Sequence, residues 1–125
     1  MRSFLDSRRR SFEFAFQGWW YVLRTQRNAW IHAVVSLAVL LVSFWLNLPA
    51  RDWAMIIIAI SMVWTAEFLN TALEAVVDLA SQHQQHELAR IGKDVGAATV
   101  LIAAMSSVVI GLLVLGPPLW ARLFK

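Results

Sequence analysis

Three long stretches of the chain carry no charged side chain, and they restrict the possible folds more than any other feature. Charges are absent from Ala33 to Ala50, from Trp53 to Ala66 and from Val95 to Ala121. The chain has 125 residues, of which 59% are hydrophobic and 15% charged. A chain this short cannot hide so much apolar surface in a water-soluble core. We therefore expect an all-α integral membrane protein with three transmembrane helices.

Helix length and stop signals set the limits of the expected spans. The stretch from Val95 to Leu115 is about 30 Å long as a helix, which matches the hydrocarbon thickness of a bilayer. The first stretch reaches this length if its helix begins near Ala29 and ends at Asn47-Leu48-Pro49. The prediction is one membrane domain, residues 1–125, with spans at 29–48, 53–80 and 93–118.

The second stretch has an apolar part of about 14 residues, which is too short to cross a bilayer by itself. It reaches full length only if the polar residues that follow belong to the same helix. On a helical wheel these residues lie within about 60° of Glu67; they are Glu67, Asn70, Thr71, Glu74 and Asp78. A carboxylate near mid-bilayer costs roughly 2.5–3.5 kcal/mol. We therefore interpret this face as functional, rather than as a means of holding helices together.

The residues before the first span form a segment of a different kind. Residues 1–28 contain six arginines and lack the apolar run of a signal peptide. Phe12, Phe16, Trp19 and Leu23 recur at helical spacing, which predicts a helix lying in the membrane interface.

The distribution of lysine and arginine predicts the orientation in the membrane. Eight of these residues precede the first span or lie between the second and third, and three lie on the other side. The N-terminus and the second loop are therefore expected in the cytoplasm. Topology accounts for the basic excess, so we expect no nucleic-acid partner. The absence of cysteine excludes disulfides and thiolate metal sites.

Two clusters suggest phosphate chemistry. The carboxylates of the second span repel one another and need a cation, and oxygen ligands suit magnesium. At the start of the third span, Lys93 could neutralise a phosphate, while Asp94 could hold a metal or orient the lysine. Alternatively, Lys93 is an interface anchor and Asp94 a helix N-cap. His32 could bind a phosphate or simply lie at the interface. No P-loop or protein-kinase motif is present, which excludes those soluble folds.

Three segments resemble one known family. The segment from Glu67 to Asp78, EFLNTALEAVVD, resembles the signature of the small prokaryotic diacylglycerol kinases, E-x-x-N-[ST]-[SA]-[IL]-E-x-x-[VI]-D. The segment 93–98, KDVGAA, resembles their second motif. The element Arg27-Asn28-x-x-Ile31-His32 is more similar to the undecaprenol kinase branch. The resemblance covers nearly the whole chain.

The resemblance implies a homotrimer in the bacterial inner membrane that transfers the γ-phosphoryl group of ATP, with Mg²⁺, to a lipid hydroxyl on the cytoplasmic side. The acceptor would be diacylglycerol or undecaprenol. The implied roles are general base and lipid contact for Glu67, lipid contact for Asn70, metal ligand for Glu74, and nucleotide contact for Asp78, His86, Lys93 and Asp94.

One position departs from the family. Where its members usually have a second metal-binding glutamate, this chain has Gln26, which can offer only a carbonyl oxygen.

A rival interpretation of the whole chain is a non-enzymatic membrane protein. In that case the acidic face would line the pore of a cation-conducting oligomer or serve only in packing.

Overall fold

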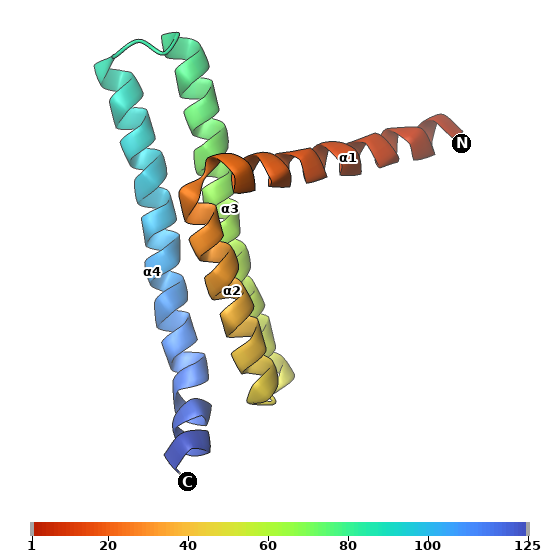
Figure 1. Cartoon of the computed structure of the whole chain (residues 1–125), viewed down its shortest axis with the longest axis vertical. Helices are drawn as coiled ribbons and strands as arrows, with labels where there is room; N and C mark the ends of the chain where they lie inside the picture. The colour runs from red at the N-terminus through yellow and green to blue at the C-terminus, as the bar shows by residue number, and fades with distance from the viewer. Residues whose placement is uncertain (1, 125) are drawn as a thin grey trace.

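The computed structural model describes residues 2–124, with only the backbone for residues 2–5. It contains four helices: α1 (Arg2–Thr25), α2 (Arg27–Trp45), α3 (Ala50–Ser81) and α4 (Glu87–Phe124). The all-α class is confirmed. Helices α2, α3 and α4 run alongside one another, while α1 leaves this bundle sideways from the start of α2 (Figure 1).

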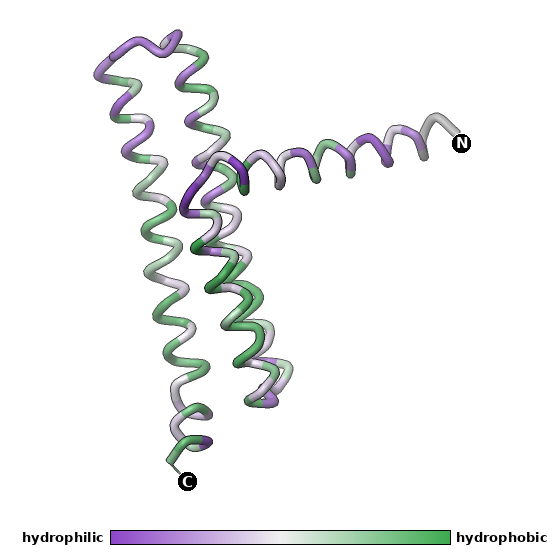
Figure 2. Tube along the Cα trace, in the orientation of Figure 1, coloured by the Kyte–Doolittle hydropathy of each residue, from purple (hydrophilic) through white to green (hydrophobic). Residues whose placement is uncertain are grey.

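Three of the four helices, α2, α3 and α4, are long and apolar enough to cross a membrane, as the sequence predicted. With 32 and 38 residues, α3 and α4 are about 48 and 57 Å long, more than a hydrocarbon core requires. Their shared end extends beyond the junction of α1 and α2, and hydrophilic residues gather there (Figure 2). Helix α3 therefore has an apolar half inside the bundle and a polar half near this end.

The connections between the helices are short. Gln26 joins α1 to α2 in an extended conformation. After α2, Asn47 adopts a left-handed conformation with φ of 51°, and Pro49 caps the start of α3. Helix α4 begins at Glu87, so Asp94 lies inside it. The alternative in which Asp94 is an N-cap is therefore wrong, because the helix starts seven residues earlier.

Helix α3 is the central helix of the bundle, and it packs against α4 through small side chains. Val63 and Ala66 form a buried cluster with Val100 and Ala103 of α4. Ser107 donates a hydrogen bond of 2.9 Å to the carbonyl oxygen of Ala59. Small side chains let two helix backbones approach closely. The close approach does not extend to Gly111, where an added Cβ would contact nothing within 4 Å.

The outward faces of α2 and α4 are apolar and exposed. Leu37 of α2 is 59% exposed, and Leu112 and Leu113 of α4 are 69% and 71% exposed. Buried apolar side chains are few by comparison. So much exposed apolar surface is stable only against lipid or another protein chain.

Candidate functional site

Polar side chains on one face of α3 form a line from the buried middle of the bundle to its polar end. Glu67 and Asn70 are buried, one turn apart, and Glu74 and Asp78 follow as half-buried residues. The hydroxyl of Thr71, also buried, donates to the carbonyl oxygen of Glu67. These side chains share a face because their spacing of three, four and seven residues matches the helical repeat. We call Glu67, Asn70, Glu74 and Asp78 the polar face of α3.

Glu74 is held by two amides from different parts of the chain. Gln26, at the junction of α1 and α2, donates from Nε2 to Oε2 of Glu74 at 3.0 Å. Asn70 donates from Nδ2 to Oε1 of Glu74 at 3.1 Å. Each carboxylate oxygen of Glu74 therefore accepts one hydrogen bond from a side-chain amide. The fold brings together the two residues that the resemblance paired as metal ligands, although they are 48 positions apart.

The atoms around Glu74 suit a magnesium ion that arrives with a phosphate ligand. Gln26 and Asn70 each carry an amide oxygen beside the nitrogen that now donates, and Oδ1 of Asn70 is buried without a hydrogen-bond partner. Within residues 2–124, no three or more His, Asp or Glu side chains form a metal-binding group. Mg²⁺ commonly binds through one or two carboxylates plus substrate phosphates. The carboxylate of Glu74 fits that pattern, with the amide oxygen of Gln26 as a further oxygen ligand.

A network of charged groups joins α3 to α4 at the polar end. Nζ of Lys93 lies 2.5 Å from Oδ1 of Asp78. Arg90 pairs with both Glu87 and Asp94, at 2.8 Å each. The carboxylate that orients Lys93 is therefore that of Asp78, while Asp94 lies against Arg90. The sequence analysis missed Arg90, although the spacing of Glu87, Arg90 and Asp94 was a sufficient signal for these pairs.

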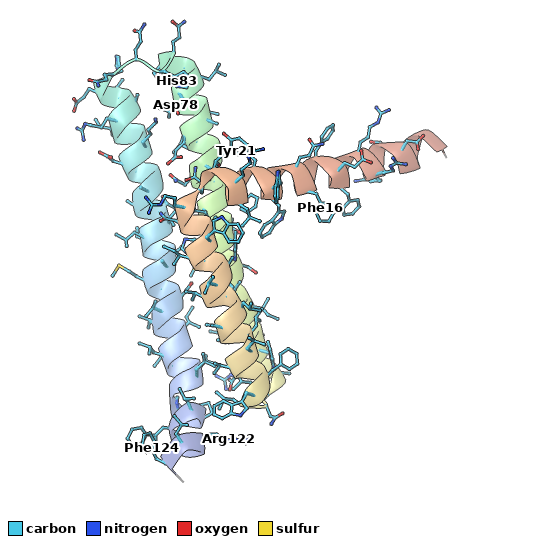
Figure 3. The ribbon with its side chains drawn as sticks, viewed as in Figure 1. Phe16, Tyr21, Asp78, His83, Arg122 and Phe124 are labelled. Carbon is cyan, nitrogen blue, oxygen red and sulfur yellow. The ribbon has the colours of Figure 1, made fainter. Side chains whose placement is uncertain are left out.

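An open cavity of about 650 Å³ lies beside this network. Its lining includes Asp78, His83, His86, Arg90 and Lys93, and Figure 3 places Asp78 and His83 at this end of the molecule. The volume lies in the range of small-molecule sites. The cavity brings His86 to the same place as Lys93. Its two cations, Arg90 and Lys93, are paired with the lining carboxylates Glu87 and Asp78, and both carry further N–H donors that a phosphate could accept from.

Glu67, at the other end of the polar face, lies in different surroundings. Its side chain is 2% exposed, and its Oε2 lies 3.6 Å from Nε2 of His32. The ring of Trp19, from α1, packs against the rings of Trp64 and Phe68, with centroids 4.8 and 4.7 Å apart. No local pattern indicates that His32 meets Glu67, because the two residues are 35 positions apart on different helices.

The sequence profile of a family described as prokaryotic diacylglycerol kinase matches residues 13–115. This region includes the whole polar face of α3, Gln26 and Lys93. The chain belongs to the prokaryotic diacylglycerol kinase family. The resemblance noted from the three motifs is thereby confirmed.

Curated relatives in this family carry two different names. A diacylglycerol kinase of Synechocystis is 43% identical over 109 residues, which is 87% of this chain and 62% of the relative. An undecaprenol kinase of Bacillus subtilis is 39% identical over 88% of this chain and 89% of the relative. A diacylglycerol kinase of Escherichia coli is 34% identical over 71% of this chain and 78% of the relative. The matched part is thus less than two thirds of the Synechocystis protein.

Membership of the diacylglycerol kinase family bears on the two interpretations of the acidic face. The names of the relatives support an ATP-dependent lipid kinase. They do not favour a pore or a packing subunit. The polar face of α3 is therefore a candidate catalytic site.

The contact between Gly96 and the polar face yields a stability prediction. A Cβ at Gly96 would clash with the amide of Asn70 and approach Cδ2 of Leu73 to 3.1 Å, whereas a Cβ at Gly111 would contact nothing within 4 Å. Overpacking costs about 1–3 kcal/mol, and alanine gains up to about 1 kcal/mol over glycine in a helix. We expect Gly96→Ala to lower the thermal unfolding midpoint in detergent and Gly111→Ala to leave it unchanged or raise it. Equal midpoints for the two variants would contradict the packing at Gly96.

Proposed function

We propose that this protein is a lipid kinase that transfers the γ-phosphoryl group of ATP to the primary hydroxyl of a membrane lipid, either diacylglycerol or undecaprenol. One observation carries the proposal. A single face of α3 links a buried carboxylate, Glu67, to a polar end where Lys93 and an open cavity can receive phosphates. The reaction needs this combination, because its acceptor comes from the membrane and its donor from water.

Each residue of this face has its own role in the reaction. The acceptor oxygen attacks the γ-phosphorus, the bond from the γ-phosphorus to its bridging oxygen breaks, and ADP leaves. Glu67 takes the proton of the hydroxyl, and Lys93, held by Asp78, neutralises phosphate charge. His86 lines the nucleotide cavity, and Asp94 acts on it through Arg90, a lining residue with which it pairs. Asn70 lies between the acceptor and donor ends.

We propose that Mg²⁺ binds at this site together with the phosphates of ATP. Glu74, with the amide oxygen of Gln26, would hold it, since Mg²⁺ prefers oxygen ligands. The ion, when bound, supplies positive charge beside the transferred phosphoryl group.

The proposal includes a position in the membrane. Helix α1 would lie in the cytoplasmic interface of the bacterial inner membrane, because it leaves the bundle sideways (Figure 1) and exposes both Phe12 and Phe16. The end of α3 and α4 would face the cytoplasm, where ATP is present, as the lysine and arginine counts indicate. The exposed apolar faces of α2 and α4 would contact lipid and the other subunits of a homotrimer.

The role of Glu74 can be tested directly. We expect Glu74→Gln to lower the rate of lipid phosphorylation at least about a hundredfold, because a metal-binding charge is lost while side-chain volume is kept. Transfer of ³²P from labelled ATP to lipid in detergent micelles measures this rate. Glu13→Gln, an exposed residue that pairs only with Arg9 among the described contacts, is the matched control and should keep wild-type activity. Normal activity of Glu74→Gln at millimolar magnesium would contradict the assignment.

Orientation can be tested with single cysteines, because the natural sequence has none. Ser81→Cys lies at the polar end of α3, and Ala50→Cys lies at the opposite end. We expect an impermeant maleimide to label Ser81→Cys only from the cytoplasmic side of sealed vesicles, and Ala50→Cys only from the other side. Labelling in the reverse pattern would place the cavity in a compartment without ATP and overturn the proposed arrangement.

A substitution at Gln26 tests the metal site by strengthening magnesium binding instead of weakening it. In Gln26→Glu the donor to Glu74 becomes a second carboxylate, so the two acids repel each other until a cation binds. We expect the magnesium concentration for half-maximal activity to fall severalfold. Gln17→Glu adds the same charge to the exposed part of α1 and should leave the magnesium titration unchanged. Identical titrations for Gln26→Glu and the wild type would remove residue 26 from the metal site.

A further inference from the structure

Two buried polar atoms face each other without closing a hydrogen bond. Nε2 of His32 and Oε2 of Glu67 are 3.6 Å apart, beyond the usual range of such bonds. Both atoms are buried, and neither has a hydrogen-bond partner. The side chains are 16% and 2% exposed, so bulk water does not readily replace the missing partners. Orphaned buried polar atoms are rare in folded proteins and require an explanation.

An ion pair that only holds α2 to α3 does not explain this geometry. A structural pair of this kind is usually closed at about 2.7–2.9 Å, and its remaining polar atoms are satisfied by further hydrogen bonds. A metal ion does not explain it either. In the part of the chain that the structure describes, no third His, Asp or Glu joins the two to make a metal-binding group.

A hydroxyl group fits the two atoms. It has one proton to donate and two lone pairs, so it can donate to Oε2 of Glu67 and accept from a protonated Nε2 of His32. An oxygen about 2.7–2.8 Å from each atom closes a triangle on the 3.6 Å edge. The hydroxyl would then already be bonded to the carboxylate that receives its proton.

The surroundings of the pair match an alcohol on an apolar body. The ring of His32 meets the ring of Trp64 edge to face, with centroids 6.4 Å apart. The indole nitrogen of Trp64 donates to Oγ of Ser36 at 3.2 Å, which fixes the ring in place. Trp19 and Phe68 extend this aromatic wall. An apolar chain could lie along such a wall, whereas the aromatic rings offer no charge to balance that of a phosphate.

We propose that His32 binds the acceptor hydroxyl together with Glu67, and so acts as an acceptor-orienting residue in phosphoryl transfer. This inference rests on the proposed function and deepens it, because it divides the polar face of α3 into an acceptor end at Glu67 and a donor end at Glu74 and Lys93. His32 holds the oxygen that attacks. Glu67 receives the proton.

Two amide variants of His32 separate this role from a structural one. The amide nitrogen of glutamine is as many bonds from the backbone as Nε2 of histidine, whereas that of asparagine matches Nδ1. We therefore expect His32→Gln to keep most of the activity with the lipid acceptor. His32→Asn and His32→Ala should lower kcat/KM for the lipid about tenfold or more, as expected when a hydrogen bond to a charged site is lost. The KM for MgATP should stay within about twofold of wild type in all three variants.

The measurement uses the full-length protein in mixed micelles, with diacylglycerol and undecaprenol tested separately and thermal unfolding recorded for each variant. Equal kcat/KM in His32→Gln and His32→Asn, whether high or low, would overturn the proposal. So would a parallel loss of MgATP affinity, since that indicates a structural effect. If the wild type phosphorylates neither lipid, the proposed function itself fails. If the wild type is active and the His32 variants have the same kcat/KM as the wild type, only the role of His32 fails.

Discussion

The carboxylates on α3 are the constraint on which the rest of the structure depends. Glu67 is buried where the polar face of α3 meets the apolar half of the helix, and an unpaired charge there is costly. The chain offsets this cost by bringing a polar group from another element to each acid. His32 faces Glu67, Gln26 and Asn70 hold Glu74, and Lys93 holds Asp78. These contacts fix the junction of α1 and α2 against α3, and they set how α4 lies against it.

Most of the fold could be predicted from local patterns. Charge-free stretches predicted the three candidate spans, and the helical repeat predicted that Glu67, Asn70, Glu74 and Asp78 share one face. Such features depend only on residues close in sequence, which is why they can be read without coordinates. The start of α4 was harder, because the polar residues after Glu87 extend the helix beyond its apolar part.

The contacts between helices could not be predicted in this way. Nothing in the spacing indicates that His32 meets Glu67, or that Asp78 and not Asp94 holds Lys93. The rotation of each helix about its axis decides these pairs, and packing of small residues such as Gly96 sets that rotation. The pairing of Gln26 with Glu74 was anticipated only through family resemblance. The fold supplies its physical reason, because the hydrogen bond donated by the Gln26 amide stabilises part of the negative charge of Glu74 when no cation is bound.

If the polar face of α3 phosphorylates a lipid alcohol, the purified wild-type protein must transfer phosphoryl groups from ATP to lipid. The protein in mixed micelles is given γ-³²P-labelled ATP, magnesium and either diacylglycerol or undecaprenol, and the lipid products are separated by thin-layer chromatography. We expect label in the lipid phosphate with at least one acceptor, and no lipid label when magnesium is chelated. ATP hydrolysis without labelled lipid, or no turnover with either acceptor, would contradict this role of the polar face.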